Sequence, residues 1–203
     1  MNKKNIALVT GASTGIGEAL SRELVQRGYS VIGLARSLDK LTNMKNELGS
    51  TFIPIVCDVS SKLDIEKASQ QISKQNLCPS IFFLNAGMAG EKVIENPNAF
   101  KLEMHEKIMA VNYFGVLAFV ECWEKPCQEN GGANFIVTSS VNAIFAAPTG
   151  SAYCASKAAI SKAFESLSLT YFATNLKFSS IYTGPVATDG LKGNWPFTWK
   201  PEK

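Results

Sequence analysis

Short apolar runs alternate along the chain with longer segments in which apolar residues recur every three or four positions. The runs cover residues 6–10, 31–35, 52–56, 81–84, 134–139 and 178–182. The periodic segments lie near residues 16–28, 38–48, 61–75, 100–124 and 152–173. Runs of the first kind are typical of buried strands, and the periodic segments are typical of helices with one apolar face. The pattern therefore predicts six strands and five helices in alternating order.

The predicted strands are apolar throughout, which favours a sheet covered by helices on both faces. Strictly alternating strands and helices favour parallel strands joined by right-handed crossovers. We therefore predict an α/β fold with a doubly wound parallel sheet, Rossmann-like, as a single domain over residues 1–203. Binding sites in such sheets lie beyond the carboxyl ends of the strands.

Glycines and polar residues follow the predicted strand ends, where such a site would form. In strand order they are Gly11 to Gly17, Arg36, Asp58 with Val59, Asn85-Ala86-Gly87, Ser140, and Thr183-Gly184-Pro185. A glycine turn between strand and helix lets backbone amides approach a pyrophosphate, although glycine also suits an ordinary turn.

The segment from Ser139 to Lys157 combines a hydroxyl, a phenol and an amine. If it is helical from Ser151 onward, Tyr153 and Lys157 lie one turn apart on the same face. Lowering a phenol pKa from about 10 to about 7 takes about 4 kcal/mol, which one cation about 4 Å away can supply at an effective dielectric near 20. The pair therefore indicates acid/base chemistry.

Composition narrows the possible functions. The net charge of +3 is small and spread along the chain, so neither a nucleic-acid partner nor a membrane surface is expected. Five cysteines without a Cys-x-x-Cys pair favour a reduced cytoplasmic protein with no metal site. A strand directly after the amino terminus, and no apolar run of about 18 residues or more, predict neither a signal peptide nor a membrane span.

The complete set of motifs resembles the short-chain dehydrogenase/reductase family, in the subgroup with a Thr-Gly-x-x-x-Gly-Ile-Gly cofactor turn. The resemblance covers residues 5 to about 190. The matching positions are Thr10 to Gly17, Asp58-Val59, Asn85-Ala86-Gly87, Val111-Asn112, Ser140, Tyr153 and Lys157. The sequence departs from the family's pattern at Leu84 and at Thr183. It also ends at Lys203, before the family's last helix and strand.

The resemblance implies a nicotinamide cofactor and a set of site residues. The catalytic residues implied are Asn112, Ser140, Tyr153 and Lys157, with Tyr153 as acid/base. The cofactor-binding residues implied are Gly11, Ser13, Thr14, Gly15, Ile16, Gly17, Arg36, Asp58, Val59, Asn85, Ala86, Gly87, Tyr153, Lys157, Gly184, Val186 and Thr188. Relatives that prefer NAD have an aspartate where Ala35 stands, and Arg36 can pair with a 2′-phosphate. NADP is therefore the expected cofactor, with NAD as the alternative.

Several residues have a second interpretation. Ser139 could replace Ser140 as the active hydroxyl, although the alternation along the strand favours Ser140. Asn112 could be a buried hydrogen-bonding residue. His105 is interpreted as a surface residue, and Cys154 as core packing. Trp195, Phe197 and Trp199 could line a substrate pocket or pack on the domain.

The predicted activity is an NADP-dependent oxidoreductase that interconverts a carbonyl and a secondary alcohol. The substrate is a small molecule whose pocket would include Met88, Asn142, Phe145 and Gly150. Alternatives are a dinucleotide-binding sensor or scaffold with little turnover, and an epimerase or dehydratase that keeps the cofactor. By resemblance, the assembly is a homodimer or homotetramer.

Overall fold

The computed structural model describes residues 5–89, 101–148 and 150–186. It contains a six-stranded parallel sheet in the order β3-β2-β1-β4-β5-β6. The strands are β1 (Ile6–Thr10), β2 (Ser30–Ala35), β3 (Phe52–Val56), β4 (Ile81–Leu84), β5 (Ala133–Ser140) and β6 (Leu176–Thr183). The strand order reverses between β1 and β4, and that reversal opens a crevice at the carboxyl ends of the strands.

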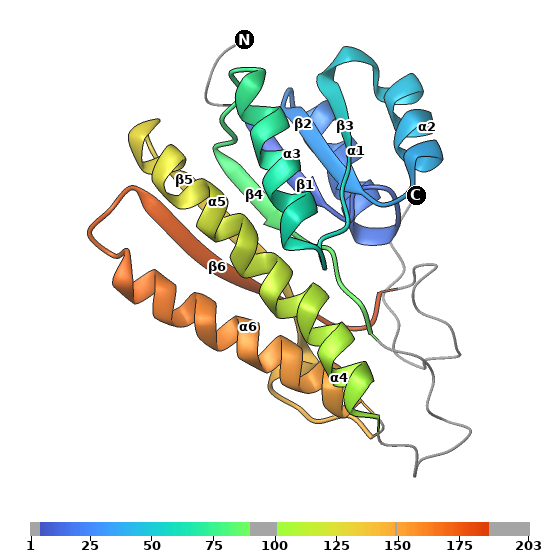
Figure 1. The fold of residues 1–203 in the computed structure, drawn as a ribbon, viewed down its shortest axis with the longest axis vertical. Coiled ribbons are helices and arrows are strands. Elements are labelled where there is room, and N and C mark those ends of the chain that lie inside the picture. The colour runs from blue at the N-terminus through green and yellow to red at the C-terminus, as the bar shows by residue number, and fades with distance from the viewer. Residues whose placement is uncertain (1–4, 90–100, 149, 187–203) are drawn as a thin grey trace.

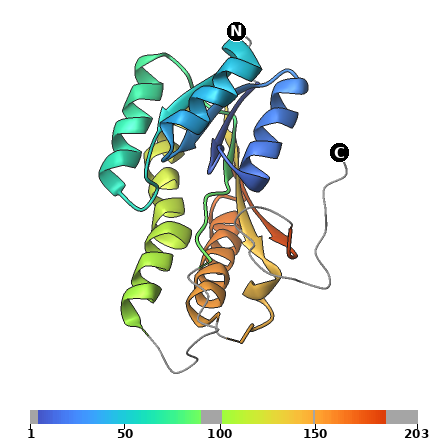
Figure 2. The ribbon, with the colours of Figure 1, turned by 90° about the vertical axis from the view of Figure 1, so that its right-hand side faces the viewer.

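Helices cover both faces of this sheet (Figures 1 and 2). They are α1 (Gly15–Gln26), α2 (Leu38–Leu48), α3 (Lys62–Lys74), α4 (Leu102–Met109), α5 (Gly115–Glu129) and α6 (Ser151–Thr170). A π-helical turn, Ala110–Phe114, joins α4 to α5, and 3-10 turns span Gly49–Thr51 and Val141–Ala143. The predicted doubly wound, Rossmann-like α/β fold is confirmed.

Two separate cores form because successive side chains of a strand point to opposite faces. Leu8 and Ile32 face α3, α5 and α6, whereas Ala7, Val9 and Val31 face α1 and α2. All five side chains have no exposed surface. Strands that are buried on both faces explain the uninterrupted apolar runs of the sequence.

An aromatic ladder fills the larger core. The register places Phe82 beside Phe135 and Phe135 beside Phe178 on neighbouring strands. Their ring centroids are 4.5 and 5.1 Å apart. Trp123 of α5 packs against Phe82, and its indole nitrogen donates a 3.0 Å hydrogen bond to the Ser69 hydroxyl. Cross-strand aromatic pairs of this kind stabilise both the sheet and its register.

The predicted helix over residues 100–124 is wrong in two respects. It is interrupted by the π turn over residues 110–114, and it continues past residue 124 to Glu129. Proline usually ends a helix, but Pro126 lies inside α5, and the next residue, Cys127, is fully buried. Tertiary packing therefore keeps the last turn helical. The other predicted elements lie within three residues of the observed bounds.

No helix in the described part of the chain is both long and apolar enough to cross a membrane.

Candidate active site

The turn between β1 and α1 uses glycine where other residues would be strained. Gly11 and Gly15 have φ angles of +67° and +56°, which favour glycine. A Cβ on Gly17 would lie 2.2 Å from the Gly11 carbonyl oxygen. The turn thus presents backbone amides and the positive end of α1 to the crevice, as a phosphate group requires. The partly buried side chains of this turn are Ser13, Thr14 and Ile16.

The segment after β4 is tied to both neighbouring strands. The Asn85 amide donates a 3.3 Å hydrogen bond to the Thr10 carbonyl and accepts a 3.1 Å bond from the Thr138 hydroxyl. The Ala86 backbone N–H donates to the Thr10 hydroxyl at 3.0 Å. Residues 85–87 therefore have a fixed position at the strand-order reversal, next to the glycine turn.

Asn112 lies in the π turn and joins three segments of the chain. Its side-chain oxygen accepts from the Met88 N–H at 2.8 Å, and its side-chain nitrogen donates to the Met88 carbonyl and the Ser156 hydroxyl at 2.9 Å each. The side chain is 1% exposed. Asn112 therefore fastens the segment after β4 to α6, consistent with the frequent use of π turns at functional sites.

Ser140, Tyr153 and Lys157 come together where β5 ends and α6 begins. A hydrogen bond joins the Ser140 hydroxyl to the Tyr153 phenol. The Lys157 ammonium lies 5.7 Å from the centroid of the Tyr153 ring and donates a 2.7 Å hydrogen bond to the Thr138 carbonyl. A Cβ on Gly87 would lie 3.4 Å from the Lys157 nitrogen. The phenol, hydroxyl and amine therefore form one compact cluster.

Burial governs protonation in this cluster. It raises the pKa of Tyr153, and the hydrogen bond from Ser140 offsets only part of the rise. It also lowers the pKa of Lys157 from 10.5 to about 8. The sequence-based expectation that Lys157 lowers the phenol pKa is therefore wrong for this structure. Burial has the largest effect on the phenol and raises its pKa.

Two adjacent serines of β5 point in opposite directions, as alternation along a strand requires. The Ser139 hydroxyl is 2.6 Å from the Ser161 hydroxyl and donates to the Lys157 carbonyl at 3.4 Å. The Ser139 hydroxyl is therefore hydrogen-bonded to α6 and not to Tyr153. The Ser140 hydroxyl faces Tyr153 and also accepts a 3.1 Å bond from the Asn142 N–H.

Arg36 and Asp58 lie beyond the carboxyl ends of the adjacent strands β2 and β3. Arg36 is exposed. Burial alone would raise the pKa of Asp58, but hydrogen bonds from the Ser60 amide and hydroxyl and the charge of Arg36 lower it. A carboxylate and a guanidinium are therefore both charged at this end of the crevice.

Comparison with known proteins places this site in a family. A family model described as short chain dehydrogenase matches residues 5–197. This chain belongs to the short-chain dehydrogenase family. An oxidoreductase of Mycobacterium tuberculosis is 27% identical over 192 residues, covering 92% of this chain but only 56% of that relative. The chain thus spans little more than half the length of the mycobacterial relatives. An oxidoreductase of Staphylococcus epidermidis is 28% identical over 191 residues, covering 94% of this chain and 82% of the relative.

Solved structures with the same fold include two at 26% identity. An alcohol dehydrogenase from the archaeon Thermococcus sibiricus, complexed with 5-hydroxy-NADP, has a TM-score of 0.85 and covers 98% of this chain and 86% of its own. A serine dehydrogenase complexed with NADP+ has a TM-score of 0.83, and the match covers 91% of this chain and 74% of the serine dehydrogenase chain. The family model and these solved structures agree on the short-chain dehydrogenase fold of this chain.

The remaining residues expected at the site follow β6. Gly184 and Val186 lie within the described ranges, and a Cβ on Gly184 would meet no atom of those ranges within 4 Å. Thr188 lies outside the described residues, as do Trp195, Phe197 and Trp199. Within the described ranges, no group of three or more histidine, cysteine, aspartate or glutamate side chains could hold a metal ion.

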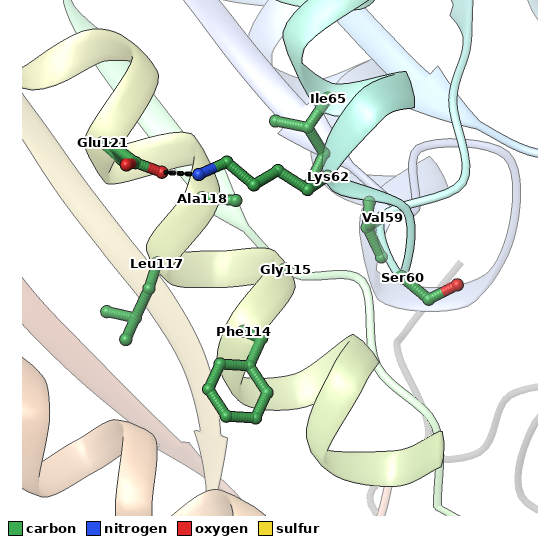
Figure 3. Close-up of a pocket in the computed structure, with 9 residues that line it drawn as sticks. All are labelled: Val59, Ser60, Lys62, Ile65, Phe114, Gly115, Leu117, Ala118 and Glu121. Atoms are coloured by element: carbon green, nitrogen blue, oxygen red, sulfur yellow. Dashed lines mark ion pairs between the residues drawn. The ribbon is translucent and has the colours of Figure 1, made fainter. Parts of the chain in front are cut away.

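A cavity of about 310 Å³ lies between α3 and α5 (Figure 3), and Tyr153 is not among the residues that line it. Val59, Phe114 and the ion pair between Lys62 and Glu121 line it, with a nitrogen to oxygen distance of 2.8 Å in the pair. At its floor, a Cβ on Gly115 would lie 2.2 Å from the Val59 carbonyl oxygen. The cavity therefore adjoins Val59 without containing the acid/base cluster of this short-chain dehydrogenase.

Two residues that the sequence analysis set aside are near the site. The His105 ring nitrogen Nε2 lies 3.2 Å from the Ser151 hydroxyl at the start of α6. The Cys154 sulfur accepts from the Ala147 N–H at 3.5 Å. Both contacts position the loop before α6, and neither side chain takes part in the contacts of Tyr153 and Lys157 given above.

Three further residues hold the site together: Thr10, which sequence reasoning named only as the start of the cofactor turn, and Thr138 and Ser156, which it missed. The Thr10 hydroxyl and the Thr138 carbonyl accept from Ala86 and Lys157. Ser156 is fully buried and donates to the Tyr153 carbonyl at 2.8 Å. Two signals were available, namely a hydroxyl residue ending the first strand and a serine directly before Lys157, but neither indicates its partner.

Proposed function

We propose that this short-chain dehydrogenase is an NADP-dependent oxidoreductase that interconverts a carbonyl and a secondary alcohol. The observation that supports this most directly is the hydrogen-bonded pair of Ser140 and Tyr153 beside the buried amine of Lys157. A phenol that can give or take a proton, with a hydroxyl beside it, suits a carbonyl oxygen that becomes an alcohol.

The residues at the crevice fit a nicotinamide dinucleotide. The glycine turn forms a cradle that a Cβ on Gly17 would fill, and backbone amides there suit a pyrophosphate. Asp58 and Val59 are suited to the adenine end, and Lys157 to the ribose at the nicotinamide end. A bound cofactor would supply or accept the hydride. The other proposed contacts are Gly11, Ser13, Thr14, Gly15, Ile16, Arg36, Asn85, Ala86, Gly87, Tyr153, Gly184, Val186 and Thr188.

Tyr153 acts as the acid in the reducing direction. Because burial raises the pKa of Tyr153, the phenol is protonated at neutral pH and can donate to the substrate oxygen. Ser140 holds the same oxygen by a second hydrogen bond and stabilises the charge that develops on it. In the oxidising direction the phenolate accepts the alcohol proton.

Lys157 returns the proton that Tyr153 loses. Its pKa of about 8 allows the amine to gain and lose a proton near neutrality. Asn112 is a positioning residue at this step, since its side-chain bonds to Met88 and Ser156 fix the backbone around Lys157. A relay through a water near Asn112 is the route we propose for that proton.

NADP preference rests on Arg36. The side chain is exposed at the end of β2, and the preceding Ala35 presents no carboxylate that would repel a 2′-phosphate. Two solved relatives, the alcohol and serine dehydrogenases, are described with NADP+ or a hydroxylated NADP. A guanidinium to phosphate contact contributes about 1.5 to 3 kcal/mol, or roughly tenfold to 150-fold in affinity. Titrating NADPH and NADH against the parent and Arg36→Ala tests this, and equal affinities in the parent would refute it.

The decisive experiment compares the parent with Tyr153→Phe. Cofactor oxidation is followed spectrophotometrically across ketones, quinones, sugars, steroids and acyl carriers, and NADPH binding is measured in parallel. We expect turnover to fall by roughly 100-fold or more in the variant while NADPH affinity changes little. A variant that retained near-normal turnover would refute the role of Tyr153.

The same experiment distinguishes the proposed enzyme from the main alternative, which is a dinucleotide-binding sensor or scaffold. Such a protein would bind NADPH tightly, show no turnover on any substrate class, and be insensitive to Tyr153→Phe. We favour the enzyme because Ser140, Tyr153 and Lys157 are all present in one cluster, and a protein that only binds the dinucleotide needs no proton donor beside the amine.

Assembly and compartment complete the proposal. Phe114 at the junction of α4 and α5 is 60% exposed, and large exposed apolar side chains suit a subunit interface. We therefore expect a homodimer or homotetramer, which light scattering of the purified protein would check. The five cysteines without a Cys-x-x-Cys pair favour the cytoplasm, which cell fractionation would check.

A further inference from the structure

Cys78 and Cys127 are in side-chain contact, although they belong to segments far apart in the sequence. Cys78 lies in the turn before β4, and Cys127 lies in the last turn of α5. The two thiols are hydrogen-bonded to each other. Each sulfur also lies against the carbonyl of the proline that is adjacent in sequence to the other cysteine. The Cys78 sulfur is 4.0 Å from the Pro126 carbonyl oxygen, and the Cys127 sulfur is 3.7 Å from that of Pro79.

These reciprocal contacts place the two side chains beside each other, and neighbouring side chains are the first requirement for a disulfide. All five cysteines of the chain are present as thiols. Cys127 has no exposed surface, whereas Cys78 is partly exposed. Of the two residues, Cys78 is therefore the one that solvent and a small oxidant can reach.

We propose that Cys78 and Cys127 form an oxidisable dithiol that a peroxide converts to an intramolecular disulfide. Hydrogen peroxide oxidises the Cys78 sulfur to a sulfenic acid, and the O–O bond breaks with release of water. The Cys127 sulfur then attacks the Cys78 sulfur. The S–S bond forms, the S–O bond breaks, and the departing hydroxide takes the Cys127 proton as a second water.

The protonation of Cys127 supports this division of roles. The hydrogen bond with Cys78 and burial together raise the pKa of the Cys127 thiol far above its usual range. A thiol held protonated is a poor first target for peroxide, because the thiolate is the reactive species. Peroxide therefore reacts first at the partly exposed Cys78. Oxidation of Cys78 removes the thiol that raises the pKa of Cys127, so the Cys127 sulfur can then lose its proton and attack the sulfenic acid beside it.

The position of the dithiol determines what oxidation changes. It lies before the amino end of β4, whereas the acid/base cluster lies beyond the carboxyl ends of the strands. Both sulfur contacts join residues 48 positions apart. A bridge over a loop of that length restricts the unfolded chain and raises the melting temperature by roughly 5 to 15 °C. This inference does not depend on the proposed function, because its test needs neither substrate nor cofactor.

Digestion after glutamate gives a direct test, because it separates all five cysteines. Cleavage leaves Cys78 in residues 67–91, Cys127 in 125–129, Cys122 in 122–124, Cys57 in 48–66 and Cys154 in 130–165. The full chain is treated with hydrogen peroxide, blocked with an alkylating agent, digested without reductant and analysed by mass spectrometry. We expect a species joining 67–91 to 125–129, lighter by two hydrogens than the sum of its peptides, that dithiothreitol removes.

The matched control is Cys122→Ala, a partly buried cysteine of the same helix. Peroxide should raise the melting temperature of the parent and of Cys122→Ala, but not of Cys78→Ser or Cys127→Ala. If Cys127→Ala fails to fold, Cys78→Ser still tests the bridge, because Cys78 is partly exposed. Oxidation that joins other peptide pairs as readily, or that leaves 67–91 and 125–129 unlinked, would overturn the proposal.

Discussion

Replacing Lys157 by methionine should make the protein more stable while abolishing its proposed activity. The side chain is 4% exposed, and its ammonium donates a hydrogen bond to the Thr138 carbonyl. Methionine has a similar length and no charge, so Lys157→Met keeps the packing and removes the buried ammonium. Replacing a buried charge by an apolar side chain of similar size is often neutral or stabilising.

The magnitude follows from the pKa of Lys157. Its fall from 10.5 to about 8 means that folding disfavours the ammonium, relative to the neutral amine, by about 3 kcal/mol. Loss of the hydrogen bond to Thr138 offsets about 1 kcal/mol of that gain. The free energy of unfolding should therefore rise by about 2 kcal/mol at pH 7, and the melting temperature by roughly 4 to 8 °C.

The sign of the pH dependence distinguishes this explanation from improved packing. The folded pKa lies below the unfolded one, so between pH 8 and 10.5 the unfolded chain binds more protons. The stability contributed by this group therefore rises with pH across that window in the parent. By about pH 9.5 the parent regains about 2 kcal/mol, so the advantage of the methionine variant should largely disappear.

Urea unfolding of both proteins at several pH values measures this difference. The matched control is Lys162→Met, an exposed lysine of the same helix paired with Glu165, whose effect should stay within about 0.5 kcal/mol. The reasoning is refuted if Lys157→Met is less stable than the parent at pH 7, or if its advantage does not shrink as pH rises.

Two further substitutions test how the site is built. Gly17→Ala places a Cβ 2.2 Å from the Gly11 carbonyl oxygen, so the free energy of unfolding should fall by about 1 to 3 kcal/mol. Gly184→Ala, whose Cβ meets no described residue, should leave it unchanged in thermal melts without cofactor. Ser156→Ala removes a partner of the buried Asn112 amide and should cost about 1 to 3 kcal/mol; an effect no larger than that of the exposed Ser166→Ala would contradict that role.

The fold could be predicted from the sequence because each element has a strong local signal. Strands buried on both faces give uninterrupted apolar runs, and their predicted bounds differ from the observed ones by two residues at most. The interruption of the long helix has no such signal. The π turn over residues 110–114 accompanies bonds from Asn112 to Met88 and Ser156, which lie 24 and 44 positions away.

The positions of the site residues could be predicted better than their interactions. Spacing along β5 favours Ser140 over Ser139, and the structure directs Ser140 toward Tyr153. Protonation could not be deduced in the same way, because it depends on burial. The sequence shows that Lys157 is one helical turn from Tyr153, but not that the ammonium bonds to Thr138 or that the phenol pKa is raised.

Two costly features of the fold lie at the same end of the sheet. The π turn that holds Asn112 and the buried ammonium of Lys157 both lie at or beyond the carboxyl ends of the strands. The stacked rings of Phe82 and Phe135 fill the interior, where packing alone explains the residues. The buried charge does not improve that core. Under the proposed function its cost is explained by the site, where the amine, with a pKa of about 8, would return a proton to Tyr153.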